Sequence, residues 1–192
     1  QSILFPAADG QQVHAFFYPP TNTAYSVLEG ELPLVIALCH GGPTGATDSG
    51  LNLKIQYWTS RGFAVVDINY RGSTGFGRTY RQSLAGAWGI ADVEDSQSAI
   101  NYLAAENRID AERCIIRGGS AGGYTVLSAL TFTDTFKAGA SLYGIGDLET
   151  LATDTHKFES RYMDSLIGPY PERKDIYTAR SPIHHAEGLN CP

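Results

Sequence analysis

The chain has 192 residues and a hydrophobic content of 43%, which predict one folded domain and exclude a disordered tail or linker. Fourteen Lys and Arg residues against twenty Asp and Glu residues give a net charge of −6. The chain therefore lacks the excess of positive charge that favours binding to nucleic acid. The longest apolar run, Leu32 to Cys39, is too short to cross a membrane. We therefore expect neither nucleic acid nor a membrane as a partner.

The three cysteines, Cys39, Cys114 and Cys191, are an odd number, and the first two lie in apolar, strand-like runs. This pattern argues against a disulfide framework and predicts a reducing, cytoplasmic location. We expect Cys39 and Cys114 to be buried and unreactive. The chain starts at Gln1 without a charged and apolar leader, which predicts a piece of a longer protein.

The amino-terminal part predicts a β-hairpin, with strands at 3–5 and 13–18 around a turn at Asp9-Gly10. Four later runs are apolar and do not alternate with polar residues, as is typical of strands that are buried on both faces. These four runs are Leu34–Cys39, Phe63–Asn69, Cys114–Arg117 and Ala138–Tyr143.

Helical spacing of apolar residues separates these strands. The predicted helices are Leu51–Ser60, Asp92–Asn107 and Ala121–Phe132, and shorter ones at Leu148–Thr153, Phe158–Leu166 and Glu172–Ala179 follow the last strand. Alternating strands and helices predict right-handed crossovers and a parallel sheet. Residues 1–192 are therefore expected to form a single α/β domain, with a mostly parallel sheet flanked by helices.

The strongest chemical signal is the run Gly118-Gly119-Ser120-Ala121-Gly122. Gly-x-Ser-x-Gly is the pattern of a nucleophile elbow, in which a serine occupies a strained turn between a strand and a helix. A structural glycine-rich turn is the alternative. The apolar run before the motif and the helical run after it favour the elbow, and they predict a positive φ at Ser120.

A second signal, His40-Gly41-Gly42-Pro43, directly follows the strand predicted at 34–39. A glycine pair lets the backbone approach an oxyanion, whose other donor is normally the N–H after the nucleophile, here that of Ala121. An ordinary turn is the alternative, and the order of the two motifs along the chain favours the oxyanion role.

A third glycine-rich segment, Asn69–Arg78, fits neither the dinucleotide-binding pattern nor a phosphate-binding loop. Trp88-Gly89, Asp92 and Asp95 follow it in the sequence. We expect no cofactor and no metal. A metal site at His184, His185 and Glu187 would have poor ligand geometry.

Taken together, these motifs resemble the prolyl oligopeptidase family of serine peptidases, and they are most similar to its acylaminoacyl-peptidase and dipeptidyl-peptidase branch. The resemblance runs from about Leu32 to Pro192. It implies an α/β-hydrolase fold, short peptides as substrates and a β-propeller that normally precedes the catalytic domain and is absent from 1–192. It also implies that Ser120 is the nucleophile, that Gly42 and Ala121 donate oxyanion N–H groups, and that Tyr143 lies near the substrate pocket.

The chain departs from the family at the other two residues of the catalytic triad. The contexts that carry the family's Asp and His do not occur here, so we expect them beyond Pro192, together with the last strands of the sheet. Asp147 is placed by topology where an acid could lie, and His156, His184 and His185 are the only later histidines. We expect these histidines to be solvated or to cap helices.

The leading hypothesis is a serine peptidase that works through an acyl-enzyme on Ser120. The 192-residue chain by itself should be nearly inactive, and the open edge of its last strand could lead to a homo-oligomer. An esterase or lipase on the same fold would use the same residues. A non-catalytic α/β-hydrolase-like binding module is the third possibility, although it has no reason to keep a strained serine.

Overall fold

A computed structural model describes residues 1–24, 28, 30–154 and 161–192. Its centre is a six-stranded sheet with the order β1-β2-β4-β3-β5-β6. The strands are β1 (Ser2–Pro6), β2 (Gln12–Tyr18), β3 (Val35–Cys39), β4 (Ala64–Asn69), β5 (Cys114–Gly119) and β6 (Ala138–Leu142). The strands β4, β3, β5 and β6 are parallel, whereas the hairpin β1–β2 adds to β4 in antiparallel orientation. The predicted hairpin and mostly parallel sheet are confirmed.

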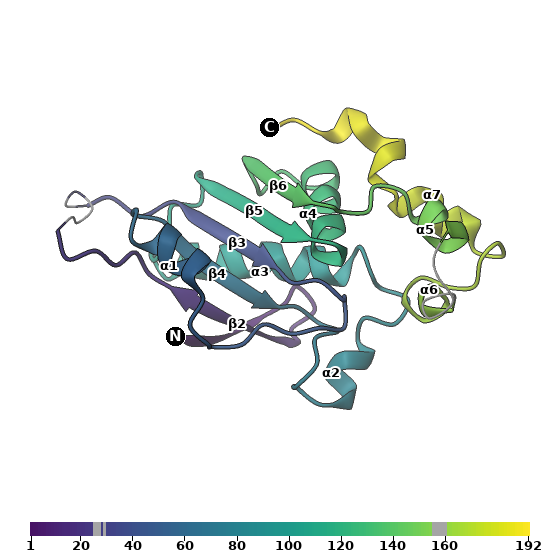
Figure 1. Ribbon diagram of the computed structural model, residues 1–192, viewed down its shortest axis with the longest axis horizontal. Helices are drawn as coiled ribbons and strands as arrows, with labels where there is room; N and C mark the ends of the chain where they lie inside the picture. Colours follow the sequence, from purple (N-terminus) through teal and green to yellow (C-terminus); the bar gives the residue numbers. More distant parts are fainter. Residues whose placement is uncertain (25–27, 29, 155–160) are drawn as a thin grey trace.

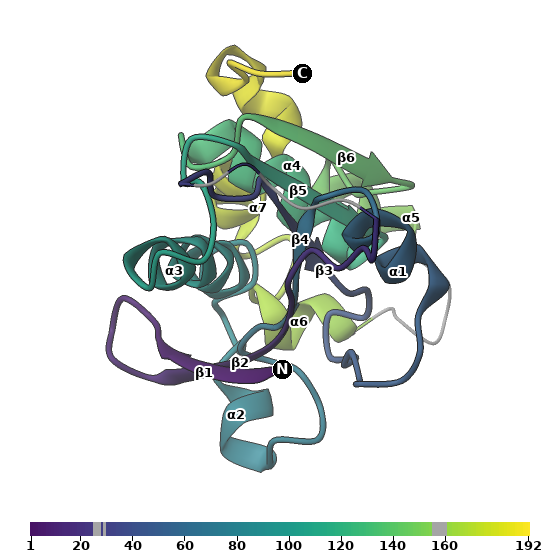
Figure 2. The same ribbon diagram turned by 90° about the vertical axis from the view of Figure 1, so that its left-hand side faces the viewer.

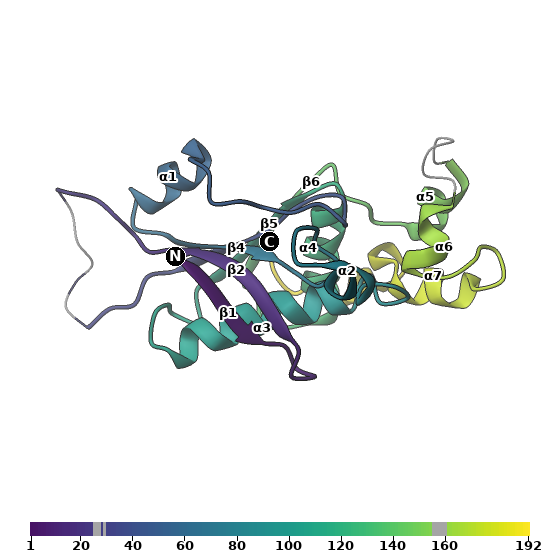
Figure 3. The same ribbon diagram turned by 90° about the horizontal axis from the view of Figure 1, so that it is seen from below.

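The helices lie on both faces of the sheet and beyond one of its ends. They are α1 (Leu53–Thr59), α2 (Arg78–Gln82), α3 (Ala91–Ala105), α4 (Ala121–Phe132), α5 (Leu148–Asp154), α6 (Tyr162–Leu166), α7 (Lys174–Arg180) and the 3₁₀ helix η1 (Pro182–Gly188). Helix α1 covers one face while α3 and α4 cover the other (Figures 1, 2 and 3). Helices α5, α6 and α7 lie past the carboxyl ends of the parallel strands (Figure 1). No helix in the described part of the chain has the length and apolar character needed to span a membrane.

The hydrophobic core is unevenly divided between the two faces. Helices α3 and α4 pack on the larger cluster, to which every strand but β6 contributes. On the other face α1 places Ile55 on Ile36 and Val65, which belong to β3 and β4. The burial predicted for four strands is therefore right for β3 and β4 only. In β5 the residues alternate between buried and half-buried, and no residue of β6 is fully buried, because the cluster under α1 takes in only the half-buried Ile115 of β5 and no residue of β6.

The helix boundaries also differ from the predicted ones. Leu51 was expected on the buried face of a helix, but it is 82% exposed, because the helix starts only after Asn52, whose side chain accepts the N–H of Lys54. Such an N-cap satisfies one of the free donors at a helix start. The predicted helix at 158–166 can be compared only from residue 161 on, where α6 is confirmed. Helix α2 and η1 were not predicted.

Strand β4 carries a buried carboxylate, Asp67, which is only 6% exposed. It accepts a hydrogen bond from the hydroxyl of Thr47, and no described Lys or Arg forms an ion pair with it. Burial raises the pKa of Asp67 to about 6.

We predict that the Asp67→Asn variant is the more stable protein at neutral pH. An acid whose pKa rises on folding stabilises the folded state fully below its unfolded pKa, 3.8, and this contribution is lost as the pH rises through about 6. The gap between these values corresponds to roughly 3 kcal/mol. In urea unfolding, the advantage of the variant should be larger by roughly 2 kcal/mol at about pH 7.5 than at about pH 4.5. An advantage that does not change with pH would contradict this origin.

The three cysteines are free, with Cys39 and Cys114 buried as predicted and Cys191 half-buried. Burial raises the pKa of Cys39 to about 12 and that of Cys114 to about 11. Because the thiolate is the reactive form, we predict that a thiol reagent at about pH 8 modifies Cys191 alone in the folded protein. The Cys191→Ser variant should lose this reaction, and rapid modification of the folded variant would refute the prediction.

Candidate active site

The chain order of the strands creates a switch point between β3 and β5. From β3 the chain crosses to β4 on one side, and it later returns to β5 on the other side. Ligands of open α/β sheets bind at the carboxyl ends of such strands. The loop that starts at His40 follows β3, and Ser120 follows β5. The two predicted catalytic motifs therefore meet at the same place.

Ser120 is exposed and joins β5 directly to α4. Its φ of 56° and ψ of −122° confirm the predicted positive φ. Such a conformation costs on the order of 1–3 kcal/mol in a non-glycine residue. The N–H of Ser120 donates to the carbonyl of Leu142 at 3.0 Å, and its own carbonyl accepts the N–H of Tyr124 at 3.0 Å. Backbone contacts on both sides of the turn hold the strained residue in place.

The glycines two residues before and after Ser120 have no room for a side chain. A Cβ on Gly118 would lie 2.5 Å from the carbonyl carbon of Gly122 and 2.9 Å from the carbonyl oxygen of Cys39. A Cβ on Gly122 would meet the carbonyl oxygens of both Cys39 and His40. The first turn of α4 thus lies in direct backbone contact with the end of β3.

The same close packing brings the Gly41-Gly42 loop to the serine. A Cβ on Gly41 would be only 3.6 Å from the Cβ of Ser120. Gly42 has a φ of 128°, in the region that favours glycine. Ala121 is the first residue of α4. Among the described residues, the N–H groups of Gly42 and Ala121 have no hydrogen-bond acceptor.

The side chain of His40 supports this loop rather than facing Ser120. Its Nδ1 lies 2.8 Å from the carbonyl oxygen of Gly41, and its Nε2 lies 2.7 Å from the hydroxyl of Ser73. Its ring stacks on Tyr70, with 4.3 Å between ring centroids. Burial lowers the pKa of His40, which favours a neutral ring. Both nitrogens are engaged, so His40 is not placed to act as a base for Ser120.

Tyr143 follows β6, is 84% exposed and has a φ of 43°. A Cβ on Gly119 would lie 2.8 Å from its hydroxyl oxygen, so the phenol covers the backbone next to Ser120. A second tyrosine, Tyr162 of α6, was not singled out in the sequence. Its hydroxyl lies 2.7 Å from that of Thr44, in the loop after β3. This bond ties α6 to the loop that contains Gly42, over a sequence distance of 118 residues.

The later acid and histidines are not assembled around Ser120. Asp147 accepts the N–H groups of Glu149 and Thr150 at the start of α5, so it caps a helix. The hydrogen bond from the Thr150 hydroxyl, together with these two backbone bonds, lowers the pKa of Asp147. His184 is exposed, as expected. His185 packs on Phe132 at the far end of α4, about 18 Å along the helix from Ser120. His156 lies outside the described residues.

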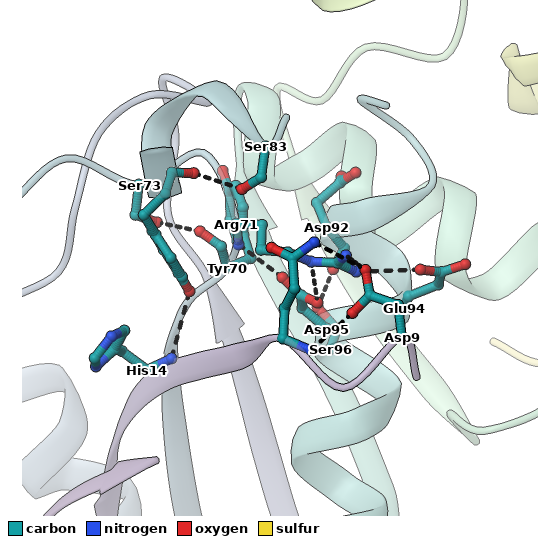
Figure 4. A network of polar contacts seen from close by, with 12 residues as sticks. Asp9, His14, Tyr70, Arg71, Ser73, Ser83, Asp92, Glu94, Asp95 and Ser96 are labelled. Atoms are coloured by element: carbon teal, nitrogen blue, oxygen red, sulfur yellow. Dashed lines mark hydrogen bonds and ion pairs between the residues drawn. The ribbon is translucent and has the colours of Figure 1, made fainter. Parts of the chain in front are cut away.

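The loop after β4 is anchored by Arg71, whose side chain is 5% exposed. Its Nε donates to Asp95 at 2.8 Å, and its main-chain N–H donates to the other oxygen of that carboxylate at 2.7 Å. Its terminal nitrogens reach Asp9 at 2.7 Å and Glu94 at 3.1 Å. Figure 4 shows how this network joins the hairpin turn, the loop and α3.

The anchored loop lies beside the site. The N–H of Thr74 donates to the carbonyl of Gly45 at 2.8 Å. Removing one partner of a buried ion pair commonly costs about 3–5 kcal/mol, so Arg71 gives the loop a strong attachment. No group of three or more metal-ligating side chains gathers within the described ranges.

We predict that the Gly118→Ala variant loses the geometry of the elbow. Its methyl group would overlap backbone atoms of Gly122 and Cys39, and backbone cannot move aside as a flexible side chain can. We expect a loss of roughly 3 kcal/mol in urea unfolding. Gly146→Ala is the control, since a Cβ there has its nearest neighbour at 4.0 Å. Equal stability of the two variants would contradict the steric argument.

Comparison with known proteins agrees with this geometry. Residues 49–192 match the model of the prolyl oligopeptidase family. Dipeptidyl aminopeptidase BIII of Pseudoxanthomonas mexicana is 32% identical over 170 residues, which are 85% of this chain and 24% of that enzyme. The acylamino-acid-releasing enzyme of Mus musculus is 36% identical over 64% of this chain and 17% of its own length. The chain spans about a quarter or less of the curated relatives it matches.

Solved structures extend the similarity to the whole chain. A puromycin-hydrolysing peptidase of Mycobacterium tuberculosis is 47% identical with a TM-score of 0.98, and an acylaminoacyl peptidase of Pyrococcus horikoshii is 29% identical with a TM-score of 0.88. Each alignment covers all of this chain and 29% and 30% of the other chain, respectively. On this evidence the chain has the α/β-hydrolase fold and belongs to the prolyl oligopeptidase family.

Proposed function

We propose that Ser120 is the nucleophile of a serine peptidase that cleaves short peptides. The observation that carries this proposal is the serine itself, an exposed hydroxyl held at a φ of 56° between a strand and a helix. A strained backbone at a ligand-accessible position supports a functional role. The N–H groups of Gly42 and Ala121, which have no acceptor among the described residues, are proposed as oxyanion donors.

In the proposed reaction the Ser120 oxygen attacks the carbonyl carbon of the scissile bond, while a base takes the hydroxyl proton. The oxyanion that forms accepts the N–H groups of Gly42 and Ala121. The C–N bond then breaks, the amine leaves with that proton, and water hydrolyses the acyl-enzyme. We propose that the base and its orienting acid come from the rest of the whole protein, because His40 and His185 pack against other residues and no hydrogen bond joins a described histidine to Ser120.

Tyr143 is proposed to line the pocket for the residue before the scissile bond, which its exposure and its contact with the Gly119 backbone support. Two structures with 44% and 47% identity are those of a puromycin hydrolase and a puromycin-hydrolysing peptidase. We therefore propose that the amide bond of puromycin is within the substrate range, alongside the dipeptidyl and acylaminoacyl peptides named for other relatives.

Location and self-association are two further proposals. A reducing, cytoplasmic location is supported by three free cysteines. Association of the 192-residue chain into a homo-oligomer is supported by β6, which pairs only with β5 among the described strands and carries an exposed Leu142. Exposed strand edges favour pairing with another chain. Light scattering of the 192-residue chain tests this point, and a monodisperse monomer would refute it.

We predict that Ser120→Ala abolishes covalent labelling by a fluorophosphonate and lowers kcat by on the order of 10⁶ in the whole protein. The substrates are puromycin, a peptide anilide and a simple ester that has the same acyl group as the anilide. Labelling of Ser120 with cleavage of the ester alone would favour an esterase. A wild-type protein that is neither labelled nor active would favour a binding module. Run in parallel, the 192-residue chain should be nearly as inactive as its own Ser120→Ala variant.

A further inference from the structure

A buried carboxylate lies behind the proposed nucleophile. Asp92 is the second residue of α3 and is fully buried. One carboxylate oxygen accepts the N–H of Gly89 at 2.7 Å, and the other accepts the hydroxyl of Thr125 at 2.6 Å. No described cationic side chain forms an ion pair with Asp92. The buried carboxyl group therefore has two neutral hydrogen-bond donors and no ion-pair partner.

Only one of these two bonds serves the helix that carries Asp92. The bond from Gly89 satisfies a backbone donor next to the start of α3, where a carboxylate also suits the helix dipole. The bond from Thr125 instead connects α3 to a different helix, α4. Burying a carboxylate costs several kcal/mol even after relaxation, and an apolar side chain would fill the same space without that cost. The second bond is the feature that needs an explanation.

Thr125 connects the carboxylate to the first turn of α4. It is fully buried, and its hydroxyl also lies 3.2 Å from the carbonyl oxygen of Ala121, one helical turn earlier. Ala121 directly follows Ser120 and supplies a proposed oxyanion N–H. Two further contacts hold the same turn: Gly122 lies against the backbone of β3, and the hydroxyl of Tyr124 donates to the carbonyl of Arg180 at 2.9 Å.

We infer that Asp92 is a positioning residue, which acts through Thr125 to fix the first turn of α4 and with it the Ser120 oxygen and the Ala121 N–H. A strained residue such as Ser120 keeps its conformation only where the surrounding structure over-determines it. Asp92 adds a directional constraint from α3 that packing alone does not supply. The inference rests on the proposed function, since it assigns Asp92 a role in the same reaction. Asp92 itself touches no substrate.

The direct test uses Thr125→Val, which keeps the shape of the side chain and removes the hydroxyl, in the whole protein. Because misplacement of a reacting group by about 1 Å costs about 10²-fold, we expect kcat to fall by roughly 10–100-fold while KM changes by less than about threefold. The rate of fluorophosphonate labelling should fall by the same factor as kcat. Thr125→Ser, which restores the hydroxyl, should recover both rates to within about threefold.

The matched control is Thr131→Val, in the same helix. Thr131 is buried like Thr125, but its hydroxyl has no partner among the described residues, so this variant should keep the wild-type kcat and labelling rate. Thermal unfolding of every variant separates positioning from stability, and rates are normalised to the folded fraction. If Thr125→Val does not fold, Asp92→Asn replaces it. The amide has a single oxygen, so it cannot accept the Gly89 N–H and the Thr125 hydroxyl on two separate oxygens as the carboxylate does.

The outcomes distinguish this inference from the proposed function. Loss of activity in Ser120→Ala together with wild-type kcat and labelling in Thr125→Val or Asp92→Asn would refute the positioning role alone. A lower melting temperature with unchanged kcat would refute it too, since a purely structural bond has that signature. An active Ser120→Ala variant would refute the proposed function itself. Equal losses in Thr125→Val and Thr131→Val would show a general packing effect and would also overturn the inference.

Discussion

The close approach of two backbones is the constraint on which the site depends. The carbonyl of Cys39, at the end of β3, lies where a side chain on Gly118 or Gly122 would have to be. Without that contact, α4 could not start directly after β5, and Ser120 would not be forced into its strained turn. The same contact brings the loop after β3 against the serine. One steric requirement therefore positions both the nucleophile and a proposed oxyanion donor.

Much of this arrangement could be predicted from the sequence, because it depends on residues that are close in the chain. The elbow, its positive φ and the helix that follows all rest on the segment 114–132, where the strand, the glycines and the helical spacing adjoin. The burial of β5 and β6 could not be predicted in this way. It depends on how far α1 extends over the sheet. Helix α1 is short, its buried cluster lies on β3 and β4, and of β5 only the half-buried Ile115 packs against that cluster.

The polar contacts of the site were the part that the sequence did not show. Asp147 was placed by topology near the site, but two nearby N–H groups make it a helix cap. The bond between Thr44 and Tyr162 and that between Asp92 and Thr125 join segments that are far apart in the chain. Threonine and tyrosine hydroxyls leave no spacing pattern, so only the three-dimensional structure reveals their partners.

Helix α3 provides an explanation for the buried charges on one side of the site. Its Asp95 holds the loop of Arg71, and its Asp92 holds α4 through Thr125. The two carboxylates are three residues apart, about one helical turn, so they lie on the same side of α3. Apolar packing is non-directional, whereas each of these hydrogen bonds requires a defined orientation of both partners. A helix that packs against the sheet through its apolar residues can thus also orient the loop of Arg71 and the helix α4, which starts at the nucleophile, and the desolvation of its carboxylates is the energetic cost of that alignment.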